Sequence, residues 1–150
     1  MWFSRASRVQ VKPFYAVLLE KKPVKGNSGH GIFIRLPDLL LAFEEATIVP
    51  RAVSKLLKKF SACTLLILDE WLLEDISDKE QHFLMELIER RHDATSTIFC
   101  TQYRRDNWHD RLGGGVHADA ILDRIVHNAV WIETGDMNMR EFQAKNTLPF

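Results

Sequence analysis

Two adjacent acidic residues, Asp69 and Glu70, directly follow the aliphatic run from Leu65 to Leu68. Such a run is typical of a buried strand, and ligands of parallel α/β sheets bind where the strands end. An aspartate at a strand end can hold Mg²⁺ beside a phosphate, and a neighbouring acid can polarise a water for attack on a phosphoryl group. The run followed by two acids is the Walker B pattern. It predicts phosphoryl chemistry here, although a strand that simply ends in solvent carries the same residue types.

Two further polar residues could take part in the same chemistry. Gln102 follows the apolar run Ser96–Thr101, where an amide could orient a water and sense a terminal phosphate. Arg124 lies in a predicted helix over residues 118–128, on the face opposite its apolar side chains. An arginine there could reach a neighbouring subunit and stabilise charge that develops on a phosphoryl group. Taken alone, the two positions fit a polar loop and a solvated helix face equally well.

The elements that would position these residues alternate between strands and helices. The predicted strands cover residues 14–20, 32–35, 64–68, 96–101 and 129–133. The first predicted helix starts at Pro37 and has an apolar face from Leu36 to Phe43, and the second has an apolar face from Val53 to Phe60. A capping box at Ser77 and Glu80 opens the third, whose apolar face runs from Phe83 to Ile88. Asp106 caps a short fourth helix through Trp108 and Leu112, and the fifth covers residues 118–128. This alternation predicts a doubly wound α/β sheet. Because the run Leu65–Leu68 is continuously apolar, we expect that strand to be buried on both faces of a parallel sheet.

Composition limits the class of protein. A chain of 150 residues that is 46% hydrophobic and 27% charged fits one soluble domain, and it contains no apolar run of about 18 residues. The start of the sequence lacks the long apolar core of a signal peptide, so we expect a cytoplasmic protein with Cys63 and Cys100 as buried free thiols. Residues 1–31 carry six Lys or Arg against one Glu, a net +5. That basic arm could contact DNA phosphates, or it could be a solvated leader.

Five segments resemble, in this order, the IstB/DnaC family of AAA+ ATPases, and most closely its IstB-like branch. They are IRLPDLLLAFEEA, LLILDEWLL, ERRHDATSTIFCTQ, NWHDRL and ADAILDRIVHNAVWIE. The resemblance covers residues 32–141, with residues 1–31 as a divergent basic segment and residues 142–150 as a tail. It implies a parallel P-loop NTPase sheet of the AAA+ type flanked by helices, with ATP and Mg²⁺ as ligands. It also implies DNA, a transposase or a replicative helicase, and further copies of the chain as partners.

The resemblance also assigns roles by position. The family's Walker B magnesium ligand matches Asp69, and its catalytic acid matches Glu70. The sensor-1 residue matches Gln102, where relatives often carry Asn, and the arginine finger matches Arg124. Arg140 resembles an arginine that contacts nucleotide after the last strand.

One family motif has no match in this sequence. The Walker A loop, G-x-x-x-x-G-K-[ST], cradles phosphates through its backbone amides and its lysine. The nearest string, Gly26–Phe33, has Ile32 and Phe33 where the lysine and the hydroxyl residue belong, so we expect a flexible loop there. The chain therefore resembles the C-terminal two-thirds of such an ATPase, with an incomplete sheet. The run Tyr15–Leu19 could fill the place of the missing central strand through a crossover to Ile32.

The resulting hypothesis is an IstB-like ATP-binding helper of transposition that hydrolyses ATP weakly or not at all. The alternative is a non-enzymatic adaptor that binds DNA or a transposase, or that resembles a helicase loader, through its basic arm and its oligomer surfaces. A metal nuclease that uses Asp69 and Glu70 is a third reading, and it is disfavoured because no further acids stand at suitable strand ends.

Overall fold

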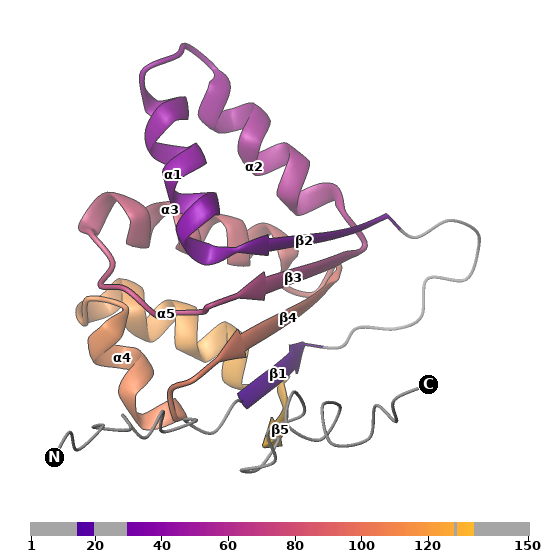
Figure 1. Cartoon of the computed structure of the whole chain (residues 1–150), viewed down its shortest axis with the longest axis vertical. Coiled ribbons are helices and arrows are strands. Elements are labelled where there is room, and N and C mark those ends of the chain that lie inside the picture. The colour runs from indigo at the N-terminus through magenta and orange to yellow at the C-terminus, as the bar shows by residue number, and fades with distance from the viewer. Residues whose placement is uncertain (1–14, 20–29, 128, 134–150) are drawn as a thin grey trace, which may run out of the picture.

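A five-stranded sheet forms the centre of the molecule (Figure 1). The computed structural model describes residues 15–19, 30–127 and 129–133. The strands are β1 (Tyr15–Leu19), β2 (Gly31–Arg35), β3 (Leu65–Asp69), β4 (Ser96–Thr101) and β5 (Ala129–Glu133). Their order across the sheet is β2-β3-β4-β1-β5.

The three neighbouring strands β2, β3 and β4 are parallel. They therefore begin at one edge of the sheet, the amino edge, and end at the other, the carboxyl edge. The parallel strands and the helices packed on them confirm the predicted α/β class, and they are consistent with part of a P-loop NTPase-like domain.

Strand β1 occupies the predicted place between β4 and β5, but it runs antiparallel to both. The expected crossover to β2 would have made β1 parallel to β2, β3 and β4, so that expectation is wrong. Leu19, the last residue of β1, pairs with Thr97 near the amino edge, where β2 also begins at Gly31. The end of β1 and the start of β2 therefore lie at the same edge of the sheet, whereas a crossover would join opposite edges. Because β5 is antiparallel to β1, it runs parallel to β4 and also begins at the amino edge.

The helices follow the sequence pattern closely. They are α1 (Leu36–Thr47), α2 (Ala52–Ala62), α3 (Asp78–Arg91), α4 (Trp108–Arg111) and α5 (Gly115–Val126), with a 3₁₀ helix η1 (Arg105–Asn107) before α4. The predicted capping box opens α3, with reciprocal hydrogen bonds between Ser77 and Glu80. The predicted cap of α4 is wrong: Asp106 lies inside η1, and Asn107 has helical dihedral angles and makes no side-chain cap. Helix α5 begins at Gly115, earlier than expected, because Gly113 and Gly114 take the positive φ values of the preceding turn.

The core lies between the helices and one face of the sheet. Leu66, Leu68 and Phe99 point into it and are almost fully buried. The side chains that alternate with them behave differently, because Leu65 and Ile67 are only half-buried and Phe33 on β2 is 63% exposed. The prediction that β3 is buried on both faces is therefore wrong. The described helices contact one another in a single connected layer rather than in two (Figure 1).

Several expectations fall outside the described residues. These are the basic arm before β1, the glycine-rich loop before His30, Arg140 and the tail. Among the helices of the described ranges, none is both long enough and apolar enough to span a bilayer. Both cysteines are free; Cys63 is buried and Cys100 is half-buried.

Candidate functional site

The sheet brings the two acids and the glutamine to the carboxyl edge. In the parallel register Leu68 pairs with Phe99, so Asp69 comes level with Cys100, and Gln102 follows two residues later. Asp69 is half-buried and Gln102 is exposed. Burial, and to a lesser degree the charge of Asp69, raises the pKa of the Cys100 thiol, as expected for neighbours across two strands. The three positions predicted by motif spacing therefore lie together.

Asp69 is arranged so that part of its carboxylate stays available. Its Oδ1 accepts the backbone N–H of Glu70 at 2.8 Å, which fixes the side chain. In the part of the chain that the structure describes, no three His, Cys, Asp or Glu side chains gather as a metal site. Mg²⁺ often takes only one or two carboxylates together with substrate phosphates and water. Asp69 thus fits a magnesium ion that is held largely by phosphate.

Glu70 is held by a residue that the sequence analysis did not single out. Its Oε2 accepts a hydrogen bond from Arg35 Nη2 at 2.7 Å, and Arg35 Nη1 lies 3.8 Å from Asp38 Oδ2. Arg35 ends β2 and pairs in register with Asp69, so the sheet delivers a cation beside the acids. The bond to Glu70 is the main cause of the raised pKa of Arg35, so its guanidinium stays charged. The sequence carries one signal for this pair: Arg35 and Glu70 have opposite charges, and each lies at the end of a predicted strand.

The backbone after the acids is tied to β4. The N–H of Trp71 donates to Cys100 O at 2.8 Å, and the Thr101 hydroxyl donates to Trp71 O at 3.0 Å. Trp71 is fully buried, and its ring meets Phe99 edge-on with centroids 4.5 Å apart. Trp108 is equally buried, and its ring centroid lies 5.9 Å from that of Trp71. Both tryptophans therefore pack in the core, where they cannot stack on nucleic acid bases.

A second arginine, Arg111 of α4, supports the same turn. Its Nη2 donates to Leu73 O at 2.6 Å, its Nε donates to Leu72 O, and its guanidinium lies 3.9 Å from the ring centroid of Tyr103. The motif NWHDRL contains Arg111, but its spacing gave no role for it. Arg111 connects the turn after the acids to the segment after β4, which carries Gln102.

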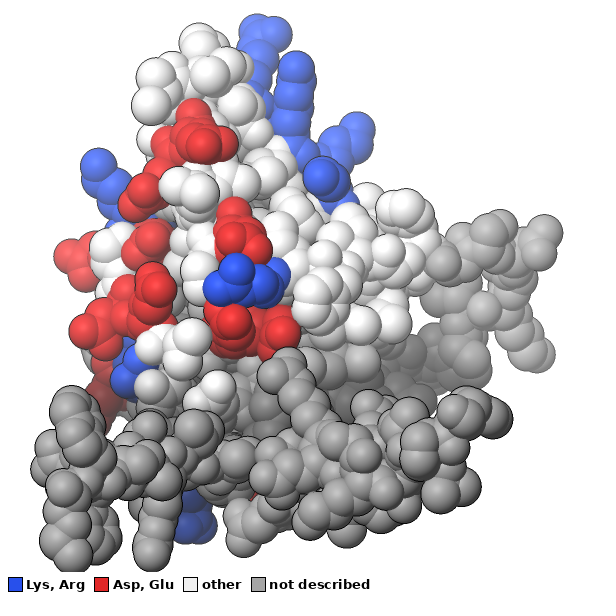
Figure 2. Space-filling view, in the orientation of Figure 1, with Lys and Arg blue, Asp and Glu red and all other residues white. Residues whose placement is uncertain are grey.

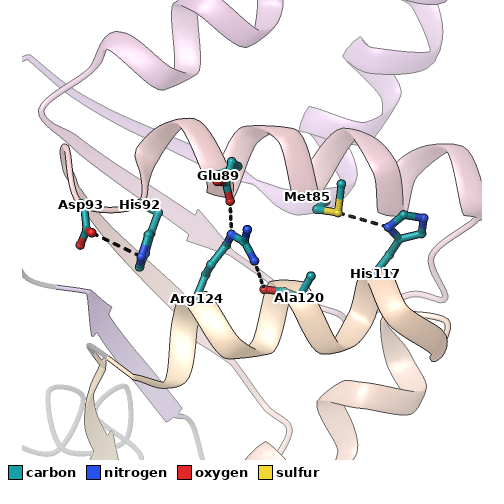
Figure 3. A network of polar contacts seen from close by, with 7 residues as sticks. All are labelled: Met85, Glu89, His92, Asp93, His117, Ala120 and Arg124. Atoms are coloured by element: carbon teal, nitrogen blue, oxygen red, sulfur yellow. Dashed lines mark hydrogen bonds and ion pairs between the residues drawn. The ribbon is translucent and has the colours of Figure 1, made fainter.

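Arg124 does not join this cluster. It lies in the last turn of α5, just before β5, and its partner Glu89 lies in the last turn of α3, just before β4 (Figure 3). Both residues are therefore near the amino edge, across the sheet from Asp69. Arg124 Nη1 also donates to Ala120 O at 3.0 Å, and the side chain is only 29% exposed. Within one chain, Glu89 already binds Arg124, so the predicted contact with a neighbouring subunit would require this ion pair to open.

The hydrogen bond from Arg124 is the main cause of a lowered pKa at Glu89. A hollow of about 260 Å³ surrounds this ion pair and is also lined by His92, Asp123 and His127. His127 Nε2 lies 2.7 Å from Asp123 Oδ1. The amino edge thus carries its own cluster of charges, separate from the acids at the carboxyl edge.

Comparison with known proteins decides the family. The model of the family described as IstB-like ATP binding protein matches residues 11–147, which is most of the chain. The chain belongs to this family. The IstB-like relatives include the insertion sequence ATP-binding protein y4uH of Sinorhizobium fredii, 35% identical over 133 residues, which are 88% of this chain and 52% of y4uH.

Two other IstB-like relatives match shorter stretches. The insertion sequence ATP-binding protein y4pL of Sinorhizobium fredii is 41% identical over 83 residues, 55% of this chain and 34% of y4pL. The IS232 ATP-binding protein of Bacillus thuringiensis subsp. berliner is 34% identical over 97 residues, 65% of this chain and 38% of that protein. The chain thus spans between about a third and a half of the length of these curated relatives.

Proposed function

We propose that this chain is an ATP-binding helper protein of an insertion sequence, which acts in the cytoplasm on DNA during transposition. The observation that carries the proposal is the carboxyl edge of the parallel strands, where Asp69, Glu70 and Gln102 lie together. Ligands of open α/β sheets bind at such edges. Family membership supports ATP as the ligand, and the names of the insertion sequence relatives support the role in transposition.

Each residue at this edge has a distinct task in the proposal. Asp69 holds Mg²⁺ together with phosphate oxygens, and the ion, when bound, neutralises phosphate charge. Glu70 polarises the attacking water, and Gln102 orients that water against the terminal phosphate. Arg35 holds the Glu70 carboxylate, so Glu70 must leave Arg35 before it can act as a base.

Arg124 acts on a neighbouring copy in the proposal. Its place near the amino edge, away from Asp69 in the same chain, suits action in trans rather than in cis. To reach a phosphate bound to a second copy, Arg124 must leave Glu89 and bind that phosphate instead. The proposed partners are neighbouring copies of the chain and the protein that this assembly serves. That protein is a transposase or a replicative helicase.

We expect ATP hydrolysis by the chain alone to be weak or undetectable, because its sequence supplies no Walker A lysine or hydroxyl for the terminal phosphates. A steady-state phosphate-release assay with Mg²⁺ tests this expectation. The comparison uses Glu70→Gln as the site variant and Glu86→Gln as the control, since Glu86 is an exposed acid on α3 that pairs with Arg90. A turnover of about 1 s⁻¹ or more that vanished in Glu70→Gln and survived in Glu86→Gln would contradict the expectation.

A second candidate, a non-enzymatic DNA adaptor, is favoured by the exposed pair Arg104 and Arg105. They line a hollow of about 260 Å³ beside Ile132 and Glu133 at the end of β5, and Arg105 lies 5.8 Å from the ring centroid of Trp131. If such arginines contact DNA phosphates, the affinity for DNA falls steeply as the salt concentration rises.

Fluorescence anisotropy with a labelled duplex separates the two candidates. The adaptor predicts salt-dependent DNA binding that ATP leaves unchanged and that weakens in Arg104→Ala with Arg105→Ala but not in Arg90→Ala. Deletion of residues 1–12 tests the basic arm and spares β1, which belongs to the sheet. DNA binding that requires ATP and Asp69 would instead exclude the adaptor.

A further inference from the structure

The turn between α1 and α2 exposes aliphatic side chains next to a row of cations. Ile48 is 83% exposed and Val49 is 56% exposed. Arg51 and Lys55 follow at the start of α2, and both are exposed. These four residues are called the tip below. Large exposed aliphatic side chains at one place mark a surface that contacts another protein more often than a nucleic acid backbone.

A groove with matching chemistry lies between the first turns of α1 and the turn that joins β3 to α3. Its apolar lining comes from Leu36, Leu40, Leu41 and Ile76, and Leu41 is 56% exposed. The groove measures about 230 Å³, below the roughly 300–1,000 Å³ of cavities that enclose small ligands. It therefore has room for one or two aliphatic side chains and not for a nucleotide.

The rim of this groove is acidic. Glu44, Glu74, Asp75 and Glu80 line it, together with Glu70 from the carboxyl edge. Within the described residues, no Lys or Arg lies within ion-pair distance of Glu44, Glu74 or Asp75. The groove thus combines an apolar floor with unpaired negative charge, and it would repel the phosphates of DNA.

The tip and the groove of one molecule cannot meet. The groove follows α1 from Leu36 to Glu44, and Ile48 of the tip comes one turn further along the same helix, so the rigid helix keeps its own tip out of the groove. The helix is held in place by packing against α3, with the rings of Phe43 and Phe83 stacked at 4.4 Å. In Figure 2, Lys and Arg gather over α2 at the top right, whereas most Asp and Glu lie on the left over α1 and the β3–α3 turn.

We propose that the tip of one copy inserts into the groove of a second copy. Ile48 and Val49 fill the apolar floor, and Arg51 and Lys55 face the acidic rim. Because tip and groove are different surfaces, the contact is head-to-tail and leaves one tip and one groove free at the ends, so it can extend into a ring or a filament. A second copy is the occupant because every molecule that carries the groove also carries the complementary tip.

This contact goes beyond the proposed function. It uses neither nucleotide nor Arg124, and it lies apart from the Glu89–Arg124 pair at the amino edge. The groove shares Glu70 with the proposed nucleotide site. Failure of the contact would leave Asp69 and Gln102 untouched, and loss of nucleotide binding in Asp69→Asn would leave the tip and the apolar floor of the groove intact.

Sedimentation velocity over a concentration series, without nucleotide, tests the contact. Ile48→Asp places an acid on the tip against the acidic rim, and we expect it to weaken self-association at least about tenfold. Val116→Asp is the matched control, since Val116 is an equally exposed aliphatic residue, 80% exposed, at the start of α5. No self-association of the unaltered chain, or equal effects of Ile48→Asp and Val116→Asp, would overturn the proposal.

A mixing experiment tests the head-to-tail geometry. Leu41→Lys spoils the groove and keeps the tip, whereas Ile48→Asp spoils the tip and keeps the groove. Each variant alone should be monomeric, and an equal mixture should form dimers that grow no further, because one intact tip meets one intact groove. A mixture that stays monomeric, or grooves that bind a basic apolar peptide but never another copy, would refute the proposed occupant. Circular dichroism verifies that both variants fold, as expected for substitutions at exposed positions.

Discussion

Glu70 is the residue where backbone and side chain are both constrained. Its φ of 53° lies in the left-handed region, which costs a residue with a Cβ about 1 kcal/mol, and its carboxylate is bound by Arg35. The hydrogen bonds of Trp71 and Thr101 hold this conformation from the far side of the turn. Strain of this kind persists where the surroundings impose it, and it often accompanies a functional side chain.

The strain at Glu70 can be measured with two substitutions that remove the same carboxylate. We expect Glu70→Gly to be more stable than Glu70→Ala by roughly 1 kcal/mol, because only glycine takes a positive φ without cost. Urea unfolding followed by circular dichroism gives both values. If alanine were as stable as glycine at this position, the left-handed conformation would not be a source of strain.

The Glu89–Arg124 pair makes a prediction about pH. Because Arg124 lowers the pKa of Glu89, the pair adds stability above the ordinary glutamate pKa of about 4.3, and this contribution is lost as pH falls through the lower folded value. In Arg124→Gln the pKa of Glu89 should rise towards the ordinary value. NMR titration of the side-chain carboxyl carbons measures the change, with Glu86 as the internal reference. An unchanged Glu89 pKa would mean that the ion pair does not form in solution.

At the scale of elements, local patterns predicted what depends on local chemistry. The apolar spacing of α1 and α2, the capping box of α3 and the bounds of β5 were all confirmed. The direction of β1 was not predictable, because five apolar residues without alternation fit either orientation and only the connection to β2 decides between them. The Arg35–Glu70 pair was missed because these two residues are 35 apart in the sequence and meet only through the register of β2 and β3.

Arg91, at the end of α3, joins three elements, and no carboxylate of the described residues pairs with it. It is 3% exposed, and its guanidinium donates to Phe60 O at 2.7 Å, Cys63 O at 2.9 Å and the Thr97 hydroxyl at 2.8 Å. Burial lowers its pKa. These bonds connect the end of α2 and the start of β4 to α3.

Removing this arginine should destabilise the fold more than removing its neighbour. We expect Arg91→Met to lower the free energy of unfolding by about 3 kcal/mol, because buried carbonyl groups lose their donors. Arg90→Met removes only an exposed ion pair to Glu86 and should cost less than about 1 kcal/mol. Equal effects of the two substitutions in urea unfolding would refute the structural role of Arg91.

At the scale of the molecule, the two edges of the sheet carry different parts of the proposed chemistry. Motif spacing alone predicted that Asp69, Glu70 and Gln102 share the carboxyl edge. The location of Arg124 near the amino edge required the path of α5 between β4 and β5, and its pairing with Glu89 required the packing of α3 on α5. The proposed function accounts for both edges through a site that a second copy would complete.

Paramagnetic relaxation tests the central claim, that the carboxyl edge binds a metal–nucleotide complex. When Mn²⁺–ATP is added to the ¹⁵N-labelled chain, we expect the strongest broadening at the amides of residues 69–72 and 101–103, even if binding is weak. Amides near Glu89 and Arg124 should broaden far less, and Asp69→Asn should abolish the effect. Broadening that centres on the amino edge, or that persists unchanged in Asp69→Asn, would contradict the account.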